Sequence, residues 1–458
     1  MRPPRSSSNA YVRLYLLIAA PLLLAFCFVT APFQVPDEPA HMFRATQLSH
    51  LSVLPQMSAA GDQAGGPVER GAVTLTTRFR TLNVPFTPDQ KRSPGEVAAM
   101  TSQPAGPAGF TDFSNTVIYF PLAHAIPALV VGAARALHAP PLDWLYAGRL
   151  VNALIALLVS AVGIALFREK GLLPLVLALL PITLFEEASL AGDALVIPFS
   201  IVLAAIVSRI AAAGRSEPRL DLLLFLALLY VCVNKFAYIP LVVLPPAAVL
   251  LGGGKRSEAM RLAAISAVAV ALWFGWTAMV RHDVLSNRPG VPVSFEDQTA
   301  FVLHHPLLTA KVLLSSIALD APKMAGQFVG SALGWLDLMT PRVIVVALLG
   351  VVAAAVALTR PTPGVRPIFR ILTILCVVAS ILAVYGLLYL QYTPVGAARV
   401  DGVQGRYFIP LAPFIPLMWP GLGGLQSLRA RGDVVLAGAA GLGALAVLVV
   451  ALLFYWRL

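Results

Sequence analysis

The stretch LYLLIAAPLLLAFCFVTA at residues 14–31, followed directly by PFQVPDEPAHMFR at residues 32–44, decides the class of fold. The first part is apolar over nearly the length that a helix needs to cross a bilayer, about 20 residues. Basic residues precede it, which gives it the polarity of a signal peptide: Arg2, Arg5 and Arg13. Pro32 directly follows the candidate cleavage site and disfavours cleavage. We therefore expect a retained membrane anchor.

The composition of the whole chain agrees with a polytopic membrane protein. Hydrophobic residues make up 58% of the 458 residues, charged residues only 12%, and the mean hydropathy is +0.81. These values exclude soluble, disordered and collagen-like proteins. The net charge of +11 is better explained by basic cytoplasmic loops than by nucleic-acid binding. The three cysteines lie in apolar runs and predict neither disulfides nor a metal site: Cys27, Cys232 and Cys376.

Long apolar segments follow one another from residue 144 to the end of the chain, after a polar stretch over residues 32–115. We predict an all-α polytopic membrane protein, with a single integral membrane domain over residues 1–458 and about eleven transmembrane helices. The predicted spans are 13–31, 144–167, 171–187, 192–210, 219–235, 237–252, 262–280, 341–358, 371–391, 407–426 and 434–456. Residues 32–143 and 281–340 then form two long external loops.

The status of residues 117–137 is decided by the positive-inside rule. If this segment does not span, thirteen basic residues share the side of the N-terminus: Arg168, Lys170, Arg209, Arg215, Arg219, Lys255, Arg256, Arg261, Arg360, Arg366, Arg370, Arg429 and Arg431. Only four lie in the opposite short loops and the tail: Lys235, Arg399, Arg406 and Arg457. We therefore predict a surface-lying or re-entrant helix there, a cytoplasmic N-terminus and an external C-terminus.

A candidate site begins directly after the first span, because Asp37, His41 and Arg44 are spaced to share one face of a helix, with Glu38 beside them. A half-buried carboxylate near a guanidinium could accept a proton from an attacking hydroxyl. The alternative explanation is structural: Asp37 as the N-cap of a helix with acidic residues in its first turn.

Three further polar groups interrupt the apolar segments. Glu186, Glu187 and Asp193 lie between two spans, where they form either a solvated turn or part of a site that faces the substrate or a divalent cation. Lys235 and Arg406 are external cations that either bind an anion, as in phosphate recognition, or reach to the interface. Tyr146, Arg149 and Asn152 form a weaker group that is more typical of helix packing.

Two apparent motifs carry no function. The run Gly252-Gly-Gly-Lys-Arg-Ser257 lacks the spacing of a phosphate-binding loop. The pair His304-His305 lacks a third metal ligand nearby.

These motifs, taken in order, resemble a bacterial membrane family, the domain-of-unknown-function family 2142, which is grouped with the GT-C glycosyltransferases. The resemblance covers about residues 12–426. It rests on VPDEPAH at 35–41, Tyr119-Phe-Pro, Arg149-Leu-Val-Asn152, Glu187-Ala-Ser-x3-Asp193, Lys235-Phe-Ala-Tyr238, Gly330-x3-Gly-Trp-Leu-Asp337 and Gln404-Gly-Arg-Tyr-Phe408.

The resemblance implies a GT-C-like bundle whose first external loop carries membrane-parallel helices and an acidic motif. It implies that Asp37 is the general base, with Glu38 as its substitute, and that Lys235, Arg406 and Tyr407 bind the donor phosphate. Four residues would face the acceptor or a divalent cation: Glu187, Asp193, His41 and Arg44. Three others would be secondary: Tyr119, Arg149 and Asn152.

The expected activity is transfer of a sugar, with inversion, from a polyprenyl-phosphate donor to a glycan or lipid acceptor of the envelope. The expected place is the external face of the bacterial inner membrane, in contact with membrane lipid. No nucleotide cofactor and no nucleic-acid partner are expected. Two alternatives stay open: a transporter or flippase of lipid-linked saccharides, whose site opens to both faces, and a non-catalytic subunit of an envelope-assembly complex.

Overall fold

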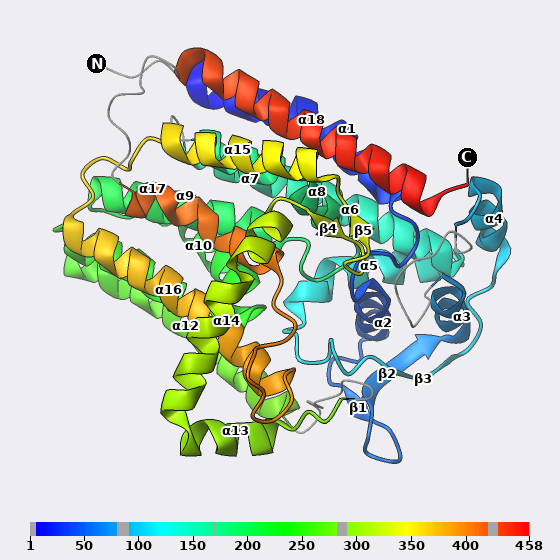
Figure 1. Cartoon of the computed structure of the whole chain (residues 1–458). Helices are drawn as coiled ribbons and strands as arrows, with labels where there is room; N and C mark the ends of the chain where they lie inside the picture. Colours follow the sequence, from blue (N-terminus) through cyan, green and yellow to red (C-terminus); the bar gives the residue numbers. More distant parts are fainter. Residues whose placement is uncertain (1–5, 80–90, 168–170, 282–290, 420–428, 458) are drawn as a thin grey trace.

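A computed structural model describes residues 6–79, 91–167, 171–281, 291–419 and 429–457 of the chain. Among the predicted basic loop residues, Arg168 and Lys170 lie outside this described part, as do the side chains of Arg429 and Arg431. The described chain is mostly helical, with two small antiparallel sheets (Figure 1).

Six described helices are long and apolar enough to cross a membrane. They are α1 (Ser6–Val29), α6 (Pro141–Phe167), α9 (Val196–Ala213), α12 (Arg256–Val280), α16 (Pro367–Gln391) and α18 (Arg429–Tyr455). A seventh span results if α13 (Phe295–His304) and α14 (Pro306–Phe328), which meet at a bend of 108°, are counted together. The chain is therefore a multi-pass membrane protein.

The prediction of eleven spans exceeds this count, because several apolar runs fold as short, broken helices. Residues 171–187 divide into α7 (Leu172–Ala178) and α8 (Pro181–Glu187), and α10 (Asp221–Leu228) passes into the π-helical η5 (Leu229–Val233). The next run divides into the 3-10 helix η6 (Phe236–Val243), with Pro240 inside it, and α11 (Leu244–Leu251).

Residues 405–418 form η7 (Gly405–Phe414), with two internal prolines, and α17 (Ile415–Met418). Proline removes a helix hydrogen bond and clashes with the preceding turn, which hydropathy alone does not register. The predicted span 341–358 is a single shorter helix, α15 (Arg342–Leu358).

The first long loop, residues 32–143, is a compact layer of helices and strands. It contains α2 (Glu38–Ser49), α3 (Arg70–Phe79), α4 (Pro94–Ala98), η2 (Ala99–Ser102) and α5 (Leu122–Ala136). Strands β1 (Gln56–Met57), β2 (Ala64–Glu69) and β3 (Ala108–Asp112) pair antiparallel in that order, with Gly65 opposite Asp112. The helix predicted within residues 117–137 is α5, which has 15 residues and packs along α2. Its Arg135 pairs with Glu69 of β2, so its C-terminal end stays with this layer.

The residues on either side of α9 (Val196–Ala213) identify the two ends of the helix bundle. Helices α1 and α18 lie side by side and parallel (Figure 1), because Trp456 Nε1 donates to Val29 O at 2.7 Å at their C-terminal ends while Tyr11 bonds Asp433 at their N-terminal ends. The 18 residues of α9 rise about 27 Å, close to the thickness of a bilayer core. Asp193 precedes α9 and Arg215 follows it. The two residues therefore lie at opposite ends of the bundle.

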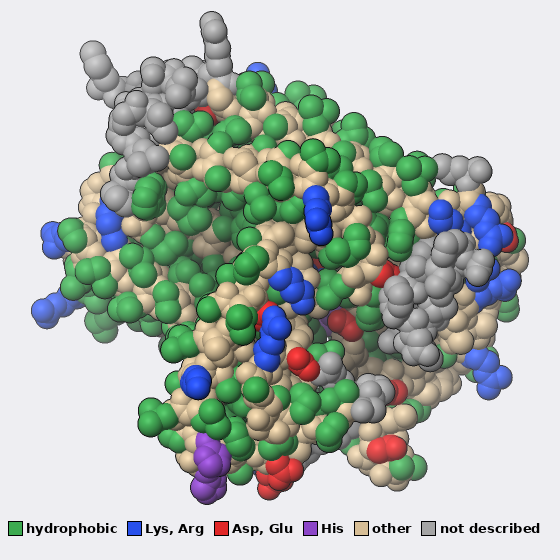
Figure 2. Space-filling view, viewed as in Figure 1, with side chains coloured by type: hydrophobic (Ala, Val, Ile, Leu, Met, Phe, Trp, Pro, Cys, Tyr) green, Lys and Arg blue, Asp and Glu red, His purple; other side chains and the backbone are tan. Residues whose placement is uncertain are grey.

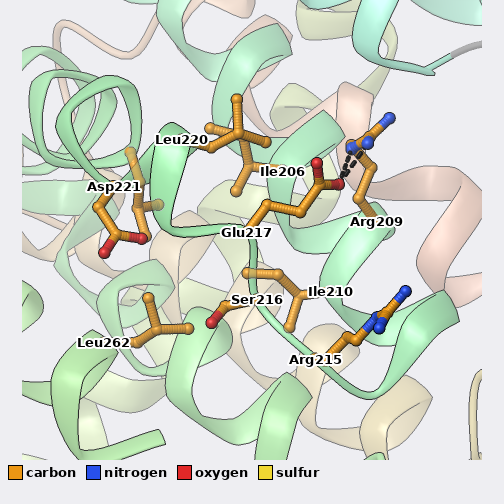
Figure 3. Close-up of a pocket in the computed structure, with 10 residues that line it drawn as sticks. Ile206, Arg209, Ile210, Arg215, Ser216, Glu217, Leu220, Asp221 and Leu262 are labelled. Atoms are coloured by element: carbon orange, nitrogen blue, oxygen red, sulfur yellow. Dashed lines mark hydrogen bonds and ion pairs between the residues drawn. The ribbon is translucent and has the colours of Figure 1, made fainter. Parts of the chain in front are cut away.

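At the Arg215 end, a hollow lies between α9, the turn that carries η4 (Pro218–Leu220), α10 and α12 (Figure 3). Its polar groups are mostly paired with one another: Arg209 with Glu217, and Arg261 with Asp221 at 3.0 Å. These pairs hold the turn in place.

The sides of the bundle are apolar. Figure 2 shows hydrophobic side chains over most of the visible face between the two ends. On α16, for example, Ile368, Ile371 and Leu375 are each more than half exposed. A soluble domain rarely exposes so continuous an apolar surface, whereas lipid tails require one.

Candidate functional site

The acidic motif after α1 forms a strained helix start. Asp37 has a left-handed backbone (φ 61°) and occupies the N-cap position of α2, but its side chain makes no capping hydrogen bond. Pro39 lies in the first turn of the helix, where its missing N–H costs nothing. The side-chain capping that was the alternative explanation for Asp37 is thus not made. Instead, Asp37 Oδ1 accepts a hydrogen bond of 2.9 Å from Asn115 Nδ2 and stays half-buried.

Lys235 lies in the turn between η5 and η6 and faces the turn before α9. Its Nζ lies 2.7 Å from Asp193 Oδ2 and donates to Tyr119 OH at 2.6 Å. The ammonium also lies 4.7 Å from the centre of the Tyr119 ring. Burial raises the pKa of Asp193, but Lys235 outweighs it and holds that pKa below its usual range. The two predicted residues therefore meet as an ion pair, with Tyr119 as a third member.

The position of Arg406 is fixed by close contact between the backbone at Gly405 and the backbone of α14. At Gly405 a Cβ would lie 2.2 Å from Met324 O of α14, so only glycine fits, and Gly405 N donates to Gln327 Oε1 at 3.0 Å. The next residue, Arg406, pairs with Glu186 of α8 and stacks over the Tyr407 ring at 5.6 Å. Tyr238 OH fixes this turn by donating to Tyr407 O at 2.7 Å.

These side chains form one group, here called the charged cluster: Asp37, Tyr119, Glu186, Asp193, Lys235 and Arg406. Burial is the largest influence on two of them: it lowers the pKa of Arg406 and raises that of Tyr119. The negative charges of Asp193 and Asp37 raise both pKa values. In this cluster each cation is paired with an acid, whereas Asp37 has the neutral Asn115 as its hydrogen-bond partner among the described residues. Asp37 is therefore the carboxylate left for other partners.

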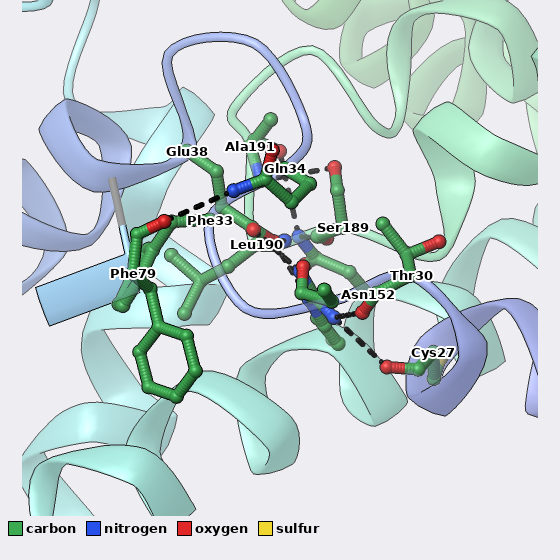
Figure 4. Close-up of polar contacts among 12 residues, drawn as sticks. Cys27, Thr30, Phe33, Gln34, Glu38, Phe79, Asn152, Ser189, Leu190 and Ala191 are labelled. Carbon is green, nitrogen blue, oxygen red and sulfur yellow. Dashed lines mark hydrogen bonds and ion pairs between the residues drawn. The ribbon is translucent and has the colours of Figure 1, made fainter. Parts of the chain in front are cut away.

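Glu38 points the other way, into a buried knot (Figure 4). It forms two hydrogen bonds with Arg149 of α6, at 2.8 and 2.6 Å, and accepts a third from Leu190 N at 3.1 Å. Arg149 also donates to three carbonyls at the end of α1, those of Cys27, Thr30 and Ala31. Asn152 Nδ2 donates to Ser189 O at 2.9 Å. The knot ties α1, α2, α6 and the turn after α8 together.

Two other predicted residues lie apart from the charged cluster. Glu187 is fully buried, and neither of its carboxylate oxygens has a hydrogen-bond partner. Arg44 is also fully buried; it donates to Gln47 and lies over the Trp276 ring at 5.7 Å, while its Nε and Nη2 have no hydrogen-bond partner. Burial lowers the pKa of Arg44 to about 10. Asp37, His41 and Arg44 were predicted to share one helix face, but Arg44 lies apart from the charged cluster that contains Asp37.

His41 lies at the edge of the charged cluster. Its ring is 5.4 Å from the Tyr119 ring and 5.0 Å from the His124 ring of α5. Burial lowers the pKa of His41, and the charges of Asp193 and Asp37 counter this only in part. The imidazole is therefore neutral at pH 7.

Three residues of the site are absent from the predicted roles: Asn115, His124 and Glu186. Glu186 was part of the acidic group, but Glu187 was assigned the role, because two adjacent acids give no periodicity that tells which one faces the site. His124 is a lone histidine in an apolar run, and Asn115 lies 78 residues from its partner Asp37. No local pattern relates such positions.

No group of three His, Cys, Asp or Glu side chains close enough to hold a metal ion occurs in the part of the chain that the structure describes. Asp193 and Glu186 are engaged by Lys235 and Arg406, and Asp37 accepts from Asn115, rather than all three converging on one point. The predicted divalent cation therefore has no ready site among these residues.

Comparison with known proteins gives one match. The model of a family described as "Predicted membrane protein (DUF2142)" matches residues 21–415. That range includes all the residues of the charged cluster and of the buried knot. Neither a curated protein nor a solved structure matches the chain.

Proposed function

The chain belongs to the DUF2142 family of predicted membrane proteins, and from this premise we propose that it transfers a sugar from a polyprenyl-phosphate donor to an envelope glycan or lipid. The observation that carries the proposal is the place of Asp37. A half-buried carboxylate without a cation partner among the described residues lies near Arg406, in the same cluster as Lys235, at one end of an apolar bundle. The assignment of sugar transfer rests on analogy with the GT-C enzymes.

The chemistry needs few groups. Asp37 accepts the proton of an acceptor hydroxyl as its oxygen attacks the anomeric carbon. The bond between that carbon and the phosphate oxygen breaks, and the polyprenyl phosphate leaves with the bonding electrons. Because the attack is a single displacement, the anomeric configuration inverts. A leaving group that is already an anionic phosphate requires positive charge rather than an acid.

Lys235 and Arg406 supply that charge. An arginine fork matches phosphate oxygens, whereas a lysine acts as a point charge. Their ion pairs with Asp193 and Glu186 hold both side chains in position, and Arg406 Nε retains an unused hydrogen bond. Tyr407 contributes its ring, over which the guanidinium stacks.

The proposed orientation follows from the two ends of the bundle. The basic loop residues Arg215, Lys255 and Arg366 belong to turns that meet at one end, since Gly214 contacts Gly252 and Gly253 contacts Arg366. By the positive-inside rule we place this end in the cytoplasm and the charged cluster at the external face of a bacterial inner membrane.

Bound lipid tests the proposal. We expect wild-type protein and Asp37→Asn, purified in mild detergent, to differ in mass spectrometry of the lipids that copurify. A polyprenyl-phosphate monosaccharide enriched on Asp37→Asn alone would support a stalled transferase and would name the donor. The control is Asp143→Asn, which changes an exposed acid at the start of α6 and should behave as wild type.

The other outcomes count against the transferase. Bulk phospholipid alone on both proteins would favour an assembly subunit without turnover. A long lipid-linked oligosaccharide on both proteins would favour transport. Full sugar transfer by Asp37→Asn to any identified acceptor would refute Asp37 as the base.

A further inference from the structure

Two buried histidines from different parts of the chain form a direct hydrogen bond. His41 of α2 and His124 of α5 lie with Nδ1 of the first 2.7 Å from Nε2 of the second, and their exposed fractions are 2% and 0%. A backbone donor reaches the same atom, because Gly192 N–H points at His41 Nδ1 from 3.3 Å. Three segments of the chain therefore converge on one ring nitrogen.

The backbone contact decides where the hydrogens are. A peptide N–H can only donate, so His41 Nδ1 carries no hydrogen and acts as an acceptor. The hydrogen between the two rings then belongs to His124 Nε2, which donates to His41. A neutral imidazole carries a single N–H, so the hydrogen of His41 lies on Nε2.

Because a neutral His124 carries its single hydrogen on Nε2, its Nδ1 has no hydrogen. Its Nδ1 is buried without a hydrogen-bond partner, which destabilises a folded protein. Burial, His41, Arg44 and Lys235 all lower the pKa of His124, which favours the neutral ring. A position that carries such a cost and serves packing alone would be better filled by a leucine.

Other charged groups face His41 from each neighbouring element. Asp37 and Glu38 lie at the start of its own helix, Asp193 follows Gly192, and Lys235 approaches from the η5–η6 turn. The two acids Asp193 and Asp37 favour a charged ring, whereas burial and Lys235 oppose it. The hydrogen bond from His124 adds to the side of the neutral ring, because a nitrogen that accepts a hydrogen bond carries no proton.

We propose that His124 is a positioning residue that holds His41 as a neutral imidazole with its hydrogen on Nε2. His41 then serves as a hydrogen-bond donor, and not as a base, to an oxygen of the ligand bound beside Asp37. The recognised group is a neutral or anionic oxygen, such as a sugar hydroxyl or a phosphoryl oxygen. The ligand assignment rests on the proposed function, whereas the tautomer and the role of His124 do not.

The tautomer can be measured on the unliganded protein. Nitrogen-15 NMR of protein labelled in its 7 histidines separates bare from protonated ring nitrogens, and His41→Gln identifies the His41 signals by their loss. In the wild type we expect His41 to keep one protonated and one bare nitrogen from about pH 7.5 to about pH 5.5, across the ordinary pKa of histidine.

Three variants isolate the role of His124. His124→Phe keeps the ring volume but removes the donor, so His41 should gain a second proton within that pH range. His124→Gln retains an amide N–H in place of Nε2–H and should leave the His41 spectrum close to wild type. His304→Gln changes an exposed histidine of α13 whose ring bonds Ala300 O, and should change no His41 signal.

Two results would overturn the proposal: a wild-type His41 with its hydrogen on Nδ1 or with both nitrogens protonated at pH 7, or a His124→Phe spectrum identical to wild type. The wild-type spectrum alone decides the tautomer if His124→Phe does not fold. A protein with the expected tautomer but without sugar transfer would refute only the proposed function. An active transferase with the other tautomer would refute only the inference about His41 and His124.

Discussion

Glu38 of α2 and Arg149 of α6 form a fully buried ion pair joined by two hydrogen bonds, although Glu38 directly follows the half-buried Asp37. The left-handed backbone at Asp37 turns these adjacent acids toward different partners. One acid holds the fold together, and the other stays available to a ligand.

The ion pair predicts a large loss of stability when one partner is removed. Arg149→Met leaves the buried Glu38 carboxylate with the Leu190 N–H alone and removes the Arg149 donor from three carbonyls at the end of α1. We expect the free energy of unfolding to fall by about 3 to 5 kcal/mol, the usual cost of breaking a buried pair. Unfolding of the detergent-solubilised protein in a denaturant series measures it.

The double variant Glu38→Leu/Arg149→Met provides the control. Because it removes both charges, it should be more stable than Arg149→Met alone. If the two losses simply add, the side chains do not interact in the way that the structure indicates.

The adjacent acids also predict a separation of activity from folding. Asp37→Asn should reduce sugar transfer by about 10² to 10⁴-fold, the range for a lost general base, and leave the thermal midpoint unchanged. Glu38→Gln should lower the thermal midpoint. Transfer assays and melting curves on the same preparations check both effects. Equal loss of stability in the two variants would contradict the division of roles.

The sequence predicted the residues of the charged cluster better than it predicted their partners. Asp37, Asp193, Lys235 and Arg406 stand out because an isolated charge near an apolar run is costly and therefore noticeable. Which opposite charge each one meets depends on contacts over long sequence separations, such as the 220 residues between Glu186 and Arg406. A single sequence does not contain that information.

Several predicted spans are not single long helices in the structure, for a related reason. Hydropathy records that residues 237–252 and 407–426 are apolar, but not that the segments with Pro240, Pro410 and Pro413 form 3-10 helices; residues 420–426 of the second span lie outside the described part of the chain. The apolar character itself was predicted correctly, and the six long helices all coincide with predicted spans. Where a helix is interrupted within an apolar segment could be learned only from the structure.

The pair of Asp193 and Lys235 predicts a change in pH dependence. Lys235 holds the folded pKa of Asp193 below its unfolded value of about 3.9, so the stabilisation from Asp193 is complete above that pH and is lost only as pH falls through the lowered pKa. In Lys235→Met, burial is opposed only by the smaller effects of His41 and Arg406, so we expect the folded pKa to rise. Asp193 then destabilises the protein at neutral pH, and the penalty disappears on acidification.

Melting curves between about pH 7 and pH 5 test this sign. The midpoint of Lys235→Met, relative to wild type, should rise as pH falls. Lys255→Met makes the same chemical change at an exposed position at the other end of the bundle and should follow wild type. A parallel pH dependence in Lys235→Met and Lys255→Met would show that Asp193 does not depend on Lys235.

The last prediction concerns Arg44, a fully buried cation without an acidic partner among the described residues. It makes one side-chain hydrogen bond, to Gln47, and burial has lowered its pKa to about 10, so its charge is a cost to the fold. Methionine has a similar length and no charge. We expect Arg44→Met to raise the free energy of unfolding by at least about 1 kcal/mol, since replacing an ill-compensated buried charge by an apolar side chain is stabilising.

Arg44→Gln provides the matched comparison, because it removes the charge but retains a polar head without full compensation, and it should gain less stability than Arg44→Met. A loss of stability in both variants would mean that the Arg44 charge is compensated in the folded protein, and an anionic group would then have to be sought at its free Nε and Nη2. Denaturant titration in detergent distinguishes the two outcomes directly, without reference to any activity.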